Sequence, residues 1–361
     1  MDVLNTMASN QAAWLEGKDA HPLAIGAADM PKPGPLEVVI KNHAVAINPL
    51  DWKMQGGMHA EKFPMIMGTD IAGEIHEVGS EVKSFKIGDR VLAHCTGIMD
   101  QKPQSGAFQL YSAAHSALTS RIPAGMSFAD AAVLPLAVST AAHGLYARDY
   151  LALPAPSASP ARPGNKCILV WGGSSSVGAA AIQLAKASGV AVLATASARN
   201  LDALKAELGV DYAFDYKSAG VVEDIVGAVK HLWDTRGIEF VGIYDAISEP
   251  QIFKEALGPI FDRLESEKLV SAKRLMMVLF PSDLPDDIQV KTVLAGLLLP
   301  GHGYEDVTRL VWESFVPEAL ETGKLKPLPP PLVVGKGLEA IQEGIDQNKK
   351  GVSFRKVVVE L

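Results

Sequence analysis

The middle of the chain alternates between apolar runs typical of buried strands and longer runs typical of helices. Residues 167–171 are apolar throughout, as expected of a parallel strand that is covered on both faces. Glycines and serines follow in GGSSSVG (172–178), and the run up to Ala187 is rich in good helix formers. A strand that turns sharply into a helix over glycines points backbone N–H groups at one place, which suits a pyrophosphate.

A second buried strand is predicted over 190–196, and Ser197, Arg199 and Asn200 follow it. Ser197 lies 19 residues after Gly178, near the spacing at which dinucleotide-binding folds contact the adenosine ribose. An acidic residue there would repel a 2′-phosphate, and hydroxyls and a guanidinium stand in its place, which favours NADPH over NADH. There are two simpler alternatives. The glycine-rich turn, in which Ser175 replaces the middle glycine, could bind no ligand, and Arg199 could be a solvated surface residue.

The remaining pattern divides the chain into two kinds of structure. Residues 1–150 are mostly β, with short strand-like runs and tight glycine turns over 36–48, 67–93 and 106–111, before a helix over 127–146. From residue 200 onward, helices are predicted over 201–208, 221–233, 251–261 and 304–322, and strands over 212–214, 239–246, near Leu269 and over 275–280. A strand, a helix and a strand fill 332–361. Strands that alternate with helices predict an α/β fold with a doubly wound parallel sheet.

Length, charge and cysteine content narrow the class of protein. The 361 residues suggest two domains, and the net charge of −8 argues against binding to nucleic acid or an anionic membrane. No apolar run reaches membrane-spanning length, and the first residues do not resemble a secretory signal. Two cysteines, Cys95 and Cys167, are too few for a four-cysteine zinc site or a disulfide framework. We therefore expect a cytoplasmic, reducing location.

Five segments together resemble the medium-chain dehydrogenase/reductase superfamily. They are NPLDWK (48–53), GTDIAGEIHEVGSEVKSFKIGDRV (68–91), GAFQLY (106–111), GGSSSVG (172–178) and GLEAIQEGIDQNKKGVSFRKVVV (337–359). Within the superfamily, the chain is most similar to fungal trans-acting enoyl reductases and to concanamycin-induced protein B-like and quinone oxidoreductase-like proteins. The resemblance implies a GroES-like catalytic domain over 1–150, completed by 325–361, and a Rossmann domain over 151–324 with NADPH in the cleft.

The superfamily also contains zinc alcohol dehydrogenases, and the sequence departs from their pattern. Their Gly-His-Glu zinc segment is replaced by Gly68-Thr69-Asp70, and their early cysteine ligand is missing from 48–53. A catalytic zinc needs three protein ligands, so we predict no metal. Without zinc, the favoured reaction is hydride addition to an activated C=C bond of an enoyl thioester or enone. An NADPH quinone oxidoreductase and a catalytically inactive NADPH-binding accessory or sensor protein are the alternatives.

The resemblance also implies roles for individual residues. Lys53 and Thr140 are the implied catalytic residues beside the nicotinamide, although a Thr140 bonded to its own helix is an equal alternative. Asp51 belongs to the same cofactor-binding group and is expected to fix its loop. The pyrophosphate is assigned to Ser174, Ser175, Ser176 and Val177, the 2′-phosphate and adenosine ribose to Ser197, Arg199, Asn200 and Tyr216, and the nicotinamide border to Leu279, Phe280, Val352 and Ser353.

The implied substrate pocket is flanked by residues 136–143 and 280–284. Leu136, Ser139, His143 and Phe280 are its candidate residues, and the aliphatic lining favours an apolar acyl chain or a quinone ring. A carrier-bound substrate and a synthase partner are compatible with the resemblance. Solvent, Tyr111 and His143 are all open as the proton source, and the sequence does not distinguish a monomer from a homodimer.

Overall fold

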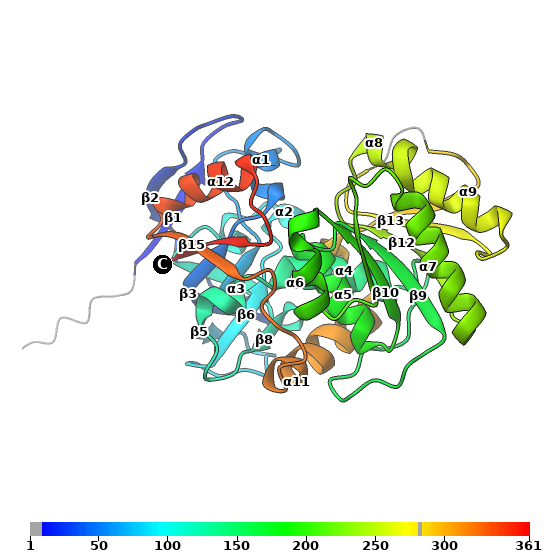
Figure 1. Cartoon of the computed structure of the whole chain (residues 1–361). Coiled ribbons are helices and arrows are strands. Elements are labelled where there is room, and N and C mark those ends of the chain that lie inside the picture. Colours follow the sequence, from blue (N-terminus) through cyan, green and yellow to red (C-terminus); the bar gives the residue numbers. More distant parts are fainter. Residues whose placement is uncertain (1–8, 281–283) are drawn as a thin grey trace, which may run out of the picture. The chain divides into compact units, whose positions relative to one another are not determined.

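The computed structural model describes residues 9–280 and 284–361, which form two compact units (Figure 1). Unit 1 contains the described residues up to Pro135 together with Pro330–Val352 and Lys356–Leu361. Unit 2 contains Leu136–Pro329 and Ser353–Arg355. The first boundary therefore lies at residue 135, whereas the sequence suggested residue 150.

Unit 2 is built on a six-stranded parallel sheet in the order β11-β10-β9-β12-β13-β14. Helices α5 and α6 lie on one face of the sheet and α7 and α9 on the other (Figure 1). This arrangement confirms the predicted doubly wound sheet. The strands are β9 (Lys166–Trp171), β10 (Ala191–Ala196), β11 (Tyr212–Asp215), β12 (Glu239–Asp245), β13 (Lys273–Met277) and β14 (Ile288–Thr292).

The helices of unit 2 follow the apolar periodicity of the sequence, with π-helical turns inserted in two of them. Phe253–Leu257 joins α8 to α9, and Arg309–Phe315 joins α10 to α11. The helices are α4 (Pro135–Tyr146), α5 (Ser176–Ala187), α6 (Leu201–Ala206), α7 (Val221–Arg236), α8 (Pro250–Ile252), α9 (Gly258–Ser266), α10 (Glu305–Thr308) and α11 (Val316–Glu321).

Two predicted features differ in the structure, and one strand was missed. The strand near Leu269 is wrong, because Leu269 is buried in the connection between α9 and β13 rather than in a strand. The single helix over 127–146 is two helices, α3 (Phe128–Ala132) and α4, since Pro135 starts a new helix at its first position. Strand β14 was not predicted.

Tyrosines in and after α4 bond to other elements of unit 2. The Tyr146 hydroxyl donates to the Leu184 carbonyl at 2.9 Å, and the Tyr150 hydroxyl donates to the Thr292 carbonyl at 3.0 Å.

The stretch Phe128–Tyr146 is the one helical segment of the described chain that is apolar and long enough to cross a membrane, and 78% of its most apolar window is buried. Such burial is typical of a core helix.

Unit 1 contains a larger sheet in the order β15-β16-β3-β5-β6-β8, with β7 also paired to β3, and a small sheet in the order β2-β1-β4. The strands are β1 (Asn10–Leu15), β2 (Ala24–Ala28), β3 (Glu37–Ala46), β4 (Met65–Ile66), β5 (Asp70–Val78), β6 (Arg90–His94), β7 (Tyr111–His115), β8 (Thr119–Arg121), β15 (Pro331–Lys336) and β16 (Lys356–Glu360). The helices are α1 (Pro49–Gln55), α2 (Gly97–Asp100), α3 and α12 (Ala340–Lys350).

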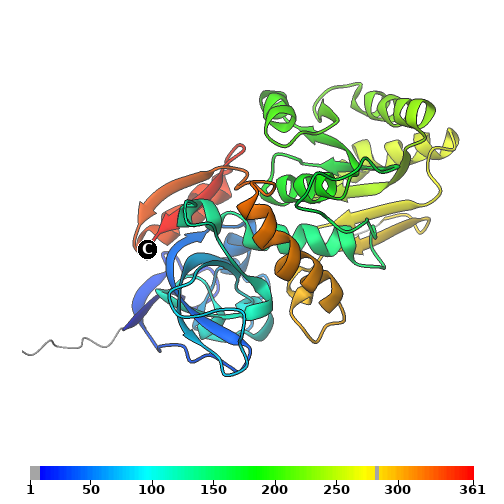
Figure 2. The same ribbon diagram turned by 90° about the horizontal axis from the view of Figure 1, so that it is seen from below.

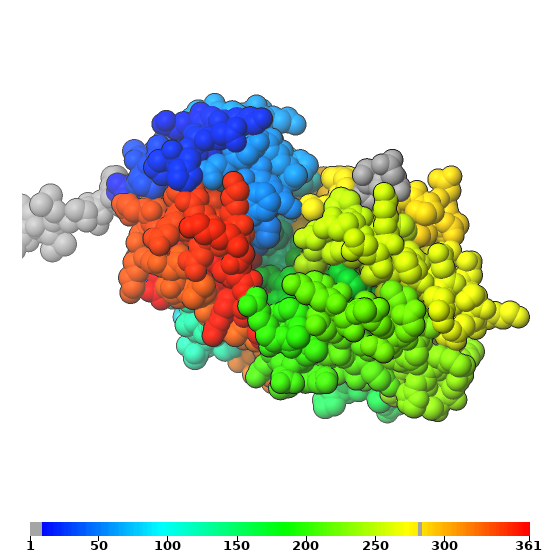
Figure 3. All heavy atoms as spheres, turned by 45° about the horizontal axis from the view of Figure 1, so that its top comes forward, coloured from blue at the N-terminus to red at the C-terminus, as the bar shows by residue number. Residues whose placement is uncertain are grey.

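The C-terminal segment of the chain completes unit 1. Strand β16 pairs antiparallel with β3, and Val358 lies opposite Ala46. Figures 2 and 3 show this segment, in orange and red, beside the N-terminal part of unit 1, in blue. The Ile47 amide donates to the Val357 carbonyl at 2.9 Å. The start of β16 therefore lies next to the residues that lead into α1.

Candidate cofactor site and active site

The glycine turn of unit 2 is packed so tightly that two of its positions exclude a side chain. Gly172 directly follows β9 and has a φ of +79°, and a Cβ atom there would lie 2.4 Å from the Ile247 side chain. A Cβ atom at Gly178, in the first turn of α5, would lie 2.2 Å from the Gly172 carbonyl oxygen. Ser174, Ser175, Ser176 and Val177, between these glycines, are half-buried, so the start of α5 keeps part of its surface exposed, as a pyrophosphate site requires.

Ser175 replaces the middle glycine of the related motifs without strain. Its φ of −75° and ψ of 164° are ordinary extended backbone, and its hydroxyl accepts a hydrogen bond from the Gly178 amide at 3.0 Å. The serine therefore caps α5. The loss of that glycine does not argue against a dinucleotide site.

The residues predicted to bind the 2′-phosphate gather where β10 and β11 end. The Asn200 amide nitrogen donates to the Ser197 hydroxyl at 3.2 Å and to the Ser353 hydroxyl at 3.1 Å. Arg199 is exposed and forms no hydrogen bond or ion pair with the described residues. The Tyr216 amide donates to the Ala196 carbonyl at 3.1 Å, which places Tyr216 at the same edge of the sheet.

A pocket of about 520 Å³ opens beside this group in unit 2. Trp171 at the end of β9, Tyr216 after β11, Val221 at the start of α7 and Ile252 in α8 contribute to its lining. The rest of the lining is of mixed polarity and includes Lys217, Ser218, Glu249, Gln251 and Glu255. The pocket lies at the carboxyl ends of parallel strands, where ligands of such sheets bind, and its two aromatic rings suit contact with the flat ring of a nucleotide base.

The hydroxyl of Thr140 is bonded within its own helix. It donates to the Leu136 carbonyl at 2.6 Å, and the Thr140 carbonyl accepts a hydrogen bond from the buried Tyr244 hydroxyl at 2.9 Å. A Thr140 hydroxyl bonded within its own helix is the alternative that the sequence left open. A role for Thr140 at the nicotinamide stays a prediction.

Two of the predicted substrate residues are fully buried and form hydrogen bonds within unit 2. The Ser139 hydroxyl accepts a hydrogen bond from the Trp312 indole at 3.0 Å, and His143 Nδ1 accepts one from the Leu294 amide at 3.2 Å. Burial, against the weaker effect of Asp149, lowers the pKa of His143 to about 4. His143 is therefore neutral near pH 7. The assignment of these residues to a substrate stays a prediction.

The residues predicted to border the nicotinamide are dispersed. Leu279 is half-buried and Phe280 is 67% exposed after β13, and residues 281–283 of the predicted pocket wall lie outside the described residues. Val352 packs against the core of unit 1. Ser353 bonds to Asn200, so the structure groups it with the residues predicted for the adenosine ribose.

In unit 1, a buried polar cluster surrounds the start of α1, the helix that carries Lys53. The Asn48 amide donates to Asp51 Oδ2 at 2.7 Å, while the Asn48 side chain donates to Thr69 Oγ1 at 3.1 Å and to Asp70 Oδ2 at 2.8 Å. The Lys356 ammonium lies 3.0 Å from Asp70 Oδ2 and donates to Asn48 Oδ1. The cluster thus links β5, α1 and β16.

Burial changes the acidity of the groups on α1. Asp51 is fully buried, its Oδ1 has no hydrogen-bond partner among the described residues, and desolvation is the main cause that raises its pKa to about 7. Desolvation also lowers the pKa of Lys53, whose Nζ lies 5.3 Å from the ring centre of Trp52.

The donors near the implied zinc position do not fit a zinc ion. Asn48, Thr69 and Lys356 contribute an amide, a hydroxyl and an ammonium group, whereas zinc prefers thiolate, imidazole and carboxylate ligands. The carboxyl groups of the cluster, Asp51 and Asp70, are two where a catalytic zinc needs three protein ligands, and Asp70 is already paired with the Lys356 ammonium. Over residues 9–280 and 284–361, no three His, Cys, Asp or Glu side chains are grouped so that they could hold a metal.

Sequence reasoning also missed a buried carboxyl group in unit 2, at the end of β12. Asp245 Oδ1 accepts hydrogen bonds from the Ile247 amide at 3.0 Å and the Ser248 amide at 2.9 Å, and burial raises the pKa of Asp245 to about 6. Ser248 has a φ of +61°, and its hydroxyl accepts from the Val278 amide at 3.0 Å. A carboxyl group inside a mostly apolar predicted strand was the available signal.

Comparisons with known proteins agree with both units. Residues 34–137 match the family model of the alcohol dehydrogenase GroES-like domain. The chain is 40% identical to "Dehydrogenase orsE" of Emericella nidulans, over 98% of this chain and 100% of that protein. It is 41% identical to "Trans-enoyl reductase himH" of Aspergillus japonicus, over 98% and 97% of the two chains.

A solved structure of a mycobacterial protein complexed with NADPH has the same fold. It superposes with a TM-score of 0.68 at 21% identity, over 98% of this chain and 100% of the other. These curated relatives align with this chain over 97–100% of their own lengths. The chain belongs to the medium-chain dehydrogenase/reductase superfamily of oxidoreductases, which use a nicotinamide cofactor, and its homologues include fungal trans-enoyl reductases and dehydrogenases.

Proposed function

We propose that this protein is an NADPH-dependent oxidoreductase that reduces a C=C bond conjugated to a carbonyl group, in an enoyl thioester or enone, by hydride transfer without zinc. The observation that carries the cofactor choice is the end of β10, where Ser197, Arg199 and Asn200 stand without an acidic residue. The exposed Arg199 guanidinium is suited to a bidentate bond with a 2′-phosphate.

The proposed cofactor fits the glycine turn of unit 2. Backbone N–H groups of Ser176 and Val177, in the first turn of α5, are placed to bind the diphosphate, since the first amides of a helix have no partner within it. Asn200 holds the hydroxyls of Ser197 and Ser353 beside the ribose. When bound, the cofactor supplies the hydride.

The reaction adds a hydride to the β-carbon, and negative charge then develops on the carbonyl oxygen. A hydrogen-bond donor near that oxygen lowers the barrier. Lys53 is the proposed residue at the nicotinamide ribose, and its role is to orient the cofactor. Because Lys53 keeps its protons in this role, the proton for the product comes from another source.

The proposed substrate class rests on a relative. The protein from Aspergillus japonicus, which is called a trans-enoyl reductase, shares 41% identity over 98% of this chain. We therefore propose an apolar acyl substrate, which a partner synthase can present on a carrier. Cys95 and Cys167 are free and buried, which fits the proposed cytoplasmic location.

The test of substrate is NADPH oxidation against enoyl thioesters, enones, quinones and aldehydes, with and without a chelator. We expect reduction of the activated alkenes and no effect of the chelator. Aldehyde reduction that the chelator abolishes would contradict the zinc-free reaction. NADPH binding without turnover of any compound would instead support an accessory role.

The test of cofactor choice is Arg199→Ala, with Arg236→Ala as the matched control. Both arginines are exposed, and Arg236 lies at the end of α7. Loss of a charge-assisted bond worth about 1.5–3 kcal/mol should raise the KM for NADPH roughly tenfold or more and leave that for NADH unchanged. Equal changes for both cofactors would show that Arg199 does not bind the 2′-phosphate.

A further inference from the structure

The short helix α1 is held at both ends by the C-terminal segment of unit 1. Pro49–Gln55 is a helix of 7 residues, too short to be stable by its own hydrogen bonds. Contacts outside the helix must therefore fix its position. Besides the core packing of Met54, these contacts include β16 at its start and α12 at its end.

At the start of α1, three buried side chains form a closed set of contacts. The Lys356 ammonium lies 3.0 Å from Asp70 Oδ2 and donates to Asn48 Oδ1, and the Asn48 amide nitrogen donates to Asp70 Oδ2 at 2.8 Å. The side chains of Lys356 and Asp70 are 2% and 0% exposed. A buried ion pair that also satisfies a neighbouring amide tolerates little displacement, because moving either charge leaves the other one uncompensated.

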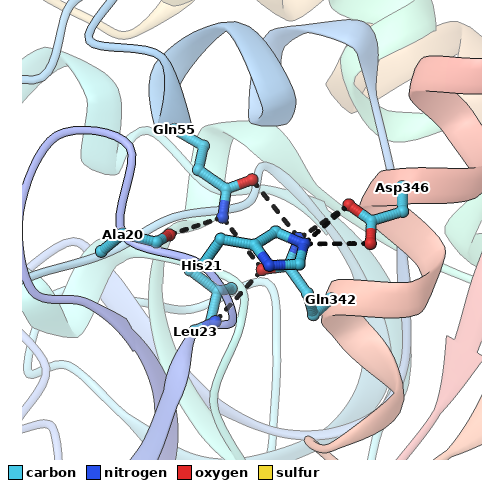
Figure 4. A network of polar contacts seen from close by, with 6 residues as sticks. All are labelled: Ala20, His21, Leu23, Gln55, Gln342 and Asp346. Carbon is cyan, nitrogen blue, oxygen red and sulfur yellow. Dashed lines mark hydrogen bonds and ion pairs between the residues drawn. The ribbon is translucent and has the colours of Figure 1, made fainter.

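At the end of α1, Gln55 bonds to α12 and to the loop before β2 (Figure 4). Its amide nitrogen donates to Gln342 Oε1 at 2.9 Å and to the Ala20 carbonyl at 2.8 Å. Gln342 Oε1 also accepts from the Leu23 amide at 3.1 Å, and Gln342 donates to Asp346 at 3.0 Å. Gln342 therefore fixes this end of the helix.

Lys53 depends on the helix for its place. Its ammonium forms no hydrogen bond or ion pair with the described residues and lies 5.3 Å from the centre of the Trp52 ring. The backbone of α1 thus determines where the ammonium can reach.

We propose that the α1 clamp, formed by Asn48, Asp70 and Lys356 at one end and Gln55 and Gln342 at the other, positions Lys53 for binding the nicotinamide half of the cofactor. The inference rests on the proposed function, which gives Lys53 that role. Within the clamp, Lys356 and Gln342 are positioning residues that act through α1.

The experiment compares equilibrium binding of NADPH with that of 2′,5′-ADP, which lacks the nicotinamide half. One variant is the double substitution Asp70→Asn with Lys356→Met, which removes both buried charges together. A second is Gln342→Met, which breaks the other end. Arg121→Ala is the control, since Arg121 bonds to Asp89 and Ser84 elsewhere in unit 1. Each variant is also made with Lys53→Met.

We expect Lys53→Met to weaken NADPH binding roughly tenfold, as loss of a charged donor does. The double variant and Gln342→Met should each weaken NADPH binding by roughly fivefold or more, as expected when a well-placed donor is lost. The affinity of each variant for 2′,5′-ADP should stay within about twofold of that of the parent. In the Lys53→Met background, neither should weaken NADPH binding further, because the loss is transmitted through Lys53. Arg121→Ala should bind both ligands like the parent.

The failures of the two proposals are distinguishable. If Lys53→Met does not alter NADPH binding, the role of Lys53 in the proposed function is wrong and the inference fails with it. If Lys53→Met weakens binding but the clamp variants bind NADPH like the parent, or lose affinity additively with Lys53→Met, the inference alone is wrong. Should the double variant fail to fold, Gln342→Met decides the matter by the same comparison.

Discussion

The glycine turn of unit 2 gives the sharpest test of the cofactor site, through the substitution Gly178→Ala. The new Cβ atom would lie 2.2 Å from the Gly172 carbonyl oxygen and 2.9 Å from Gly173 Cα, whereas ordinary contacts begin near 3.4 Å. Both neighbours are backbone, so the turn itself must move by about 1 Å to relieve the contact. A displacement of that size misaligns the amides that would bind the diphosphate.

The expected cost can be worked from this displacement. Overpacking of a well-packed site costs about 1–3 kcal/mol of stability, and this loss exceeds the gain of about 0.5–1 kcal/mol from replacing glycine by alanine in a helix. Loss of one charge-assisted hydrogen bond, worth about 1.5–3 kcal/mol, raises the Kd for NADPH roughly tenfold to a hundredfold.

The assay is a fluorescence titration with NADPH, together with thermal unfolding, and the control is Gly227→Ala. Gly227 lies within α7, is exposed, and a Cβ atom there would meet nothing within 4 Å. The control should therefore be slightly stabilised and bind NADPH like the parent. The reasoning is refuted if Gly178→Ala binds NADPH within about twofold of the parent, or if both variants lose affinity equally.

Three further substitutions test other parts of the structure. Ser248→Ala should lower the unfolding free energy of unit 2 by about 1–3 kcal/mol, because it leaves the Val278 amide without its acceptor, and a urea midpoint equal to that of the parent would contradict this. Burial raises the pKa of Asp51 from 3.8 to about 7, so the parent loses stability as pH rises between these values, while its unfolded state ionises first. The unfolding free energy of Asp51→Asn, measured with urea, should accordingly rise relative to that of the parent as pH increases over this range, and the difference should stay constant above it. A difference that does not change with pH would contradict the raised pKa. Tyr146→Phe should lower stability by roughly 1 kcal/mol through loss of the bond to the Leu184 carbonyl, measured in the same way, and no loss would show that the bond contributes nothing.

The parts of the fold that could be predicted are those that local patterns specify. Apolar strands, glycines and a helix-forming run are adjacent in 167–187, so β9, the turn and α5 follow from neighbouring residues. Strand β14 was missed, although Ile288, Val290 and Thr292 alternate with polar residues. Helix α1 was also missed, and Asn48 followed by Pro49 was its available start signal.

The parts of the site that could not be predicted depend on pairings between distant segments. Nothing near Asp70 in the sequence indicates that Lys356 lies against it, because the pairings of β3 with β16 and with β5 bring them together. Ser353 likewise reaches Asn200 only in the folded chain. A lysine at the head of the apolar run VVV (357–359) is a sign of a buried partner, but it does not identify that partner.

The interleaved path of the chain has a consequence for synthesis on the ribosome. Unit 2 is almost one continuous stretch, whereas the sheet of unit 1 needs β15 and β16, which are translated after the whole of unit 2. Since domains form as their residues emerge, unit 2 can finish folding while the edge of β3 that pairs with β16 is still unpaired. A nascent chain halted before residue 330 would present that open edge to chaperones, so late pausing of translation is expected to leave unit 1 the part most exposed to quality control.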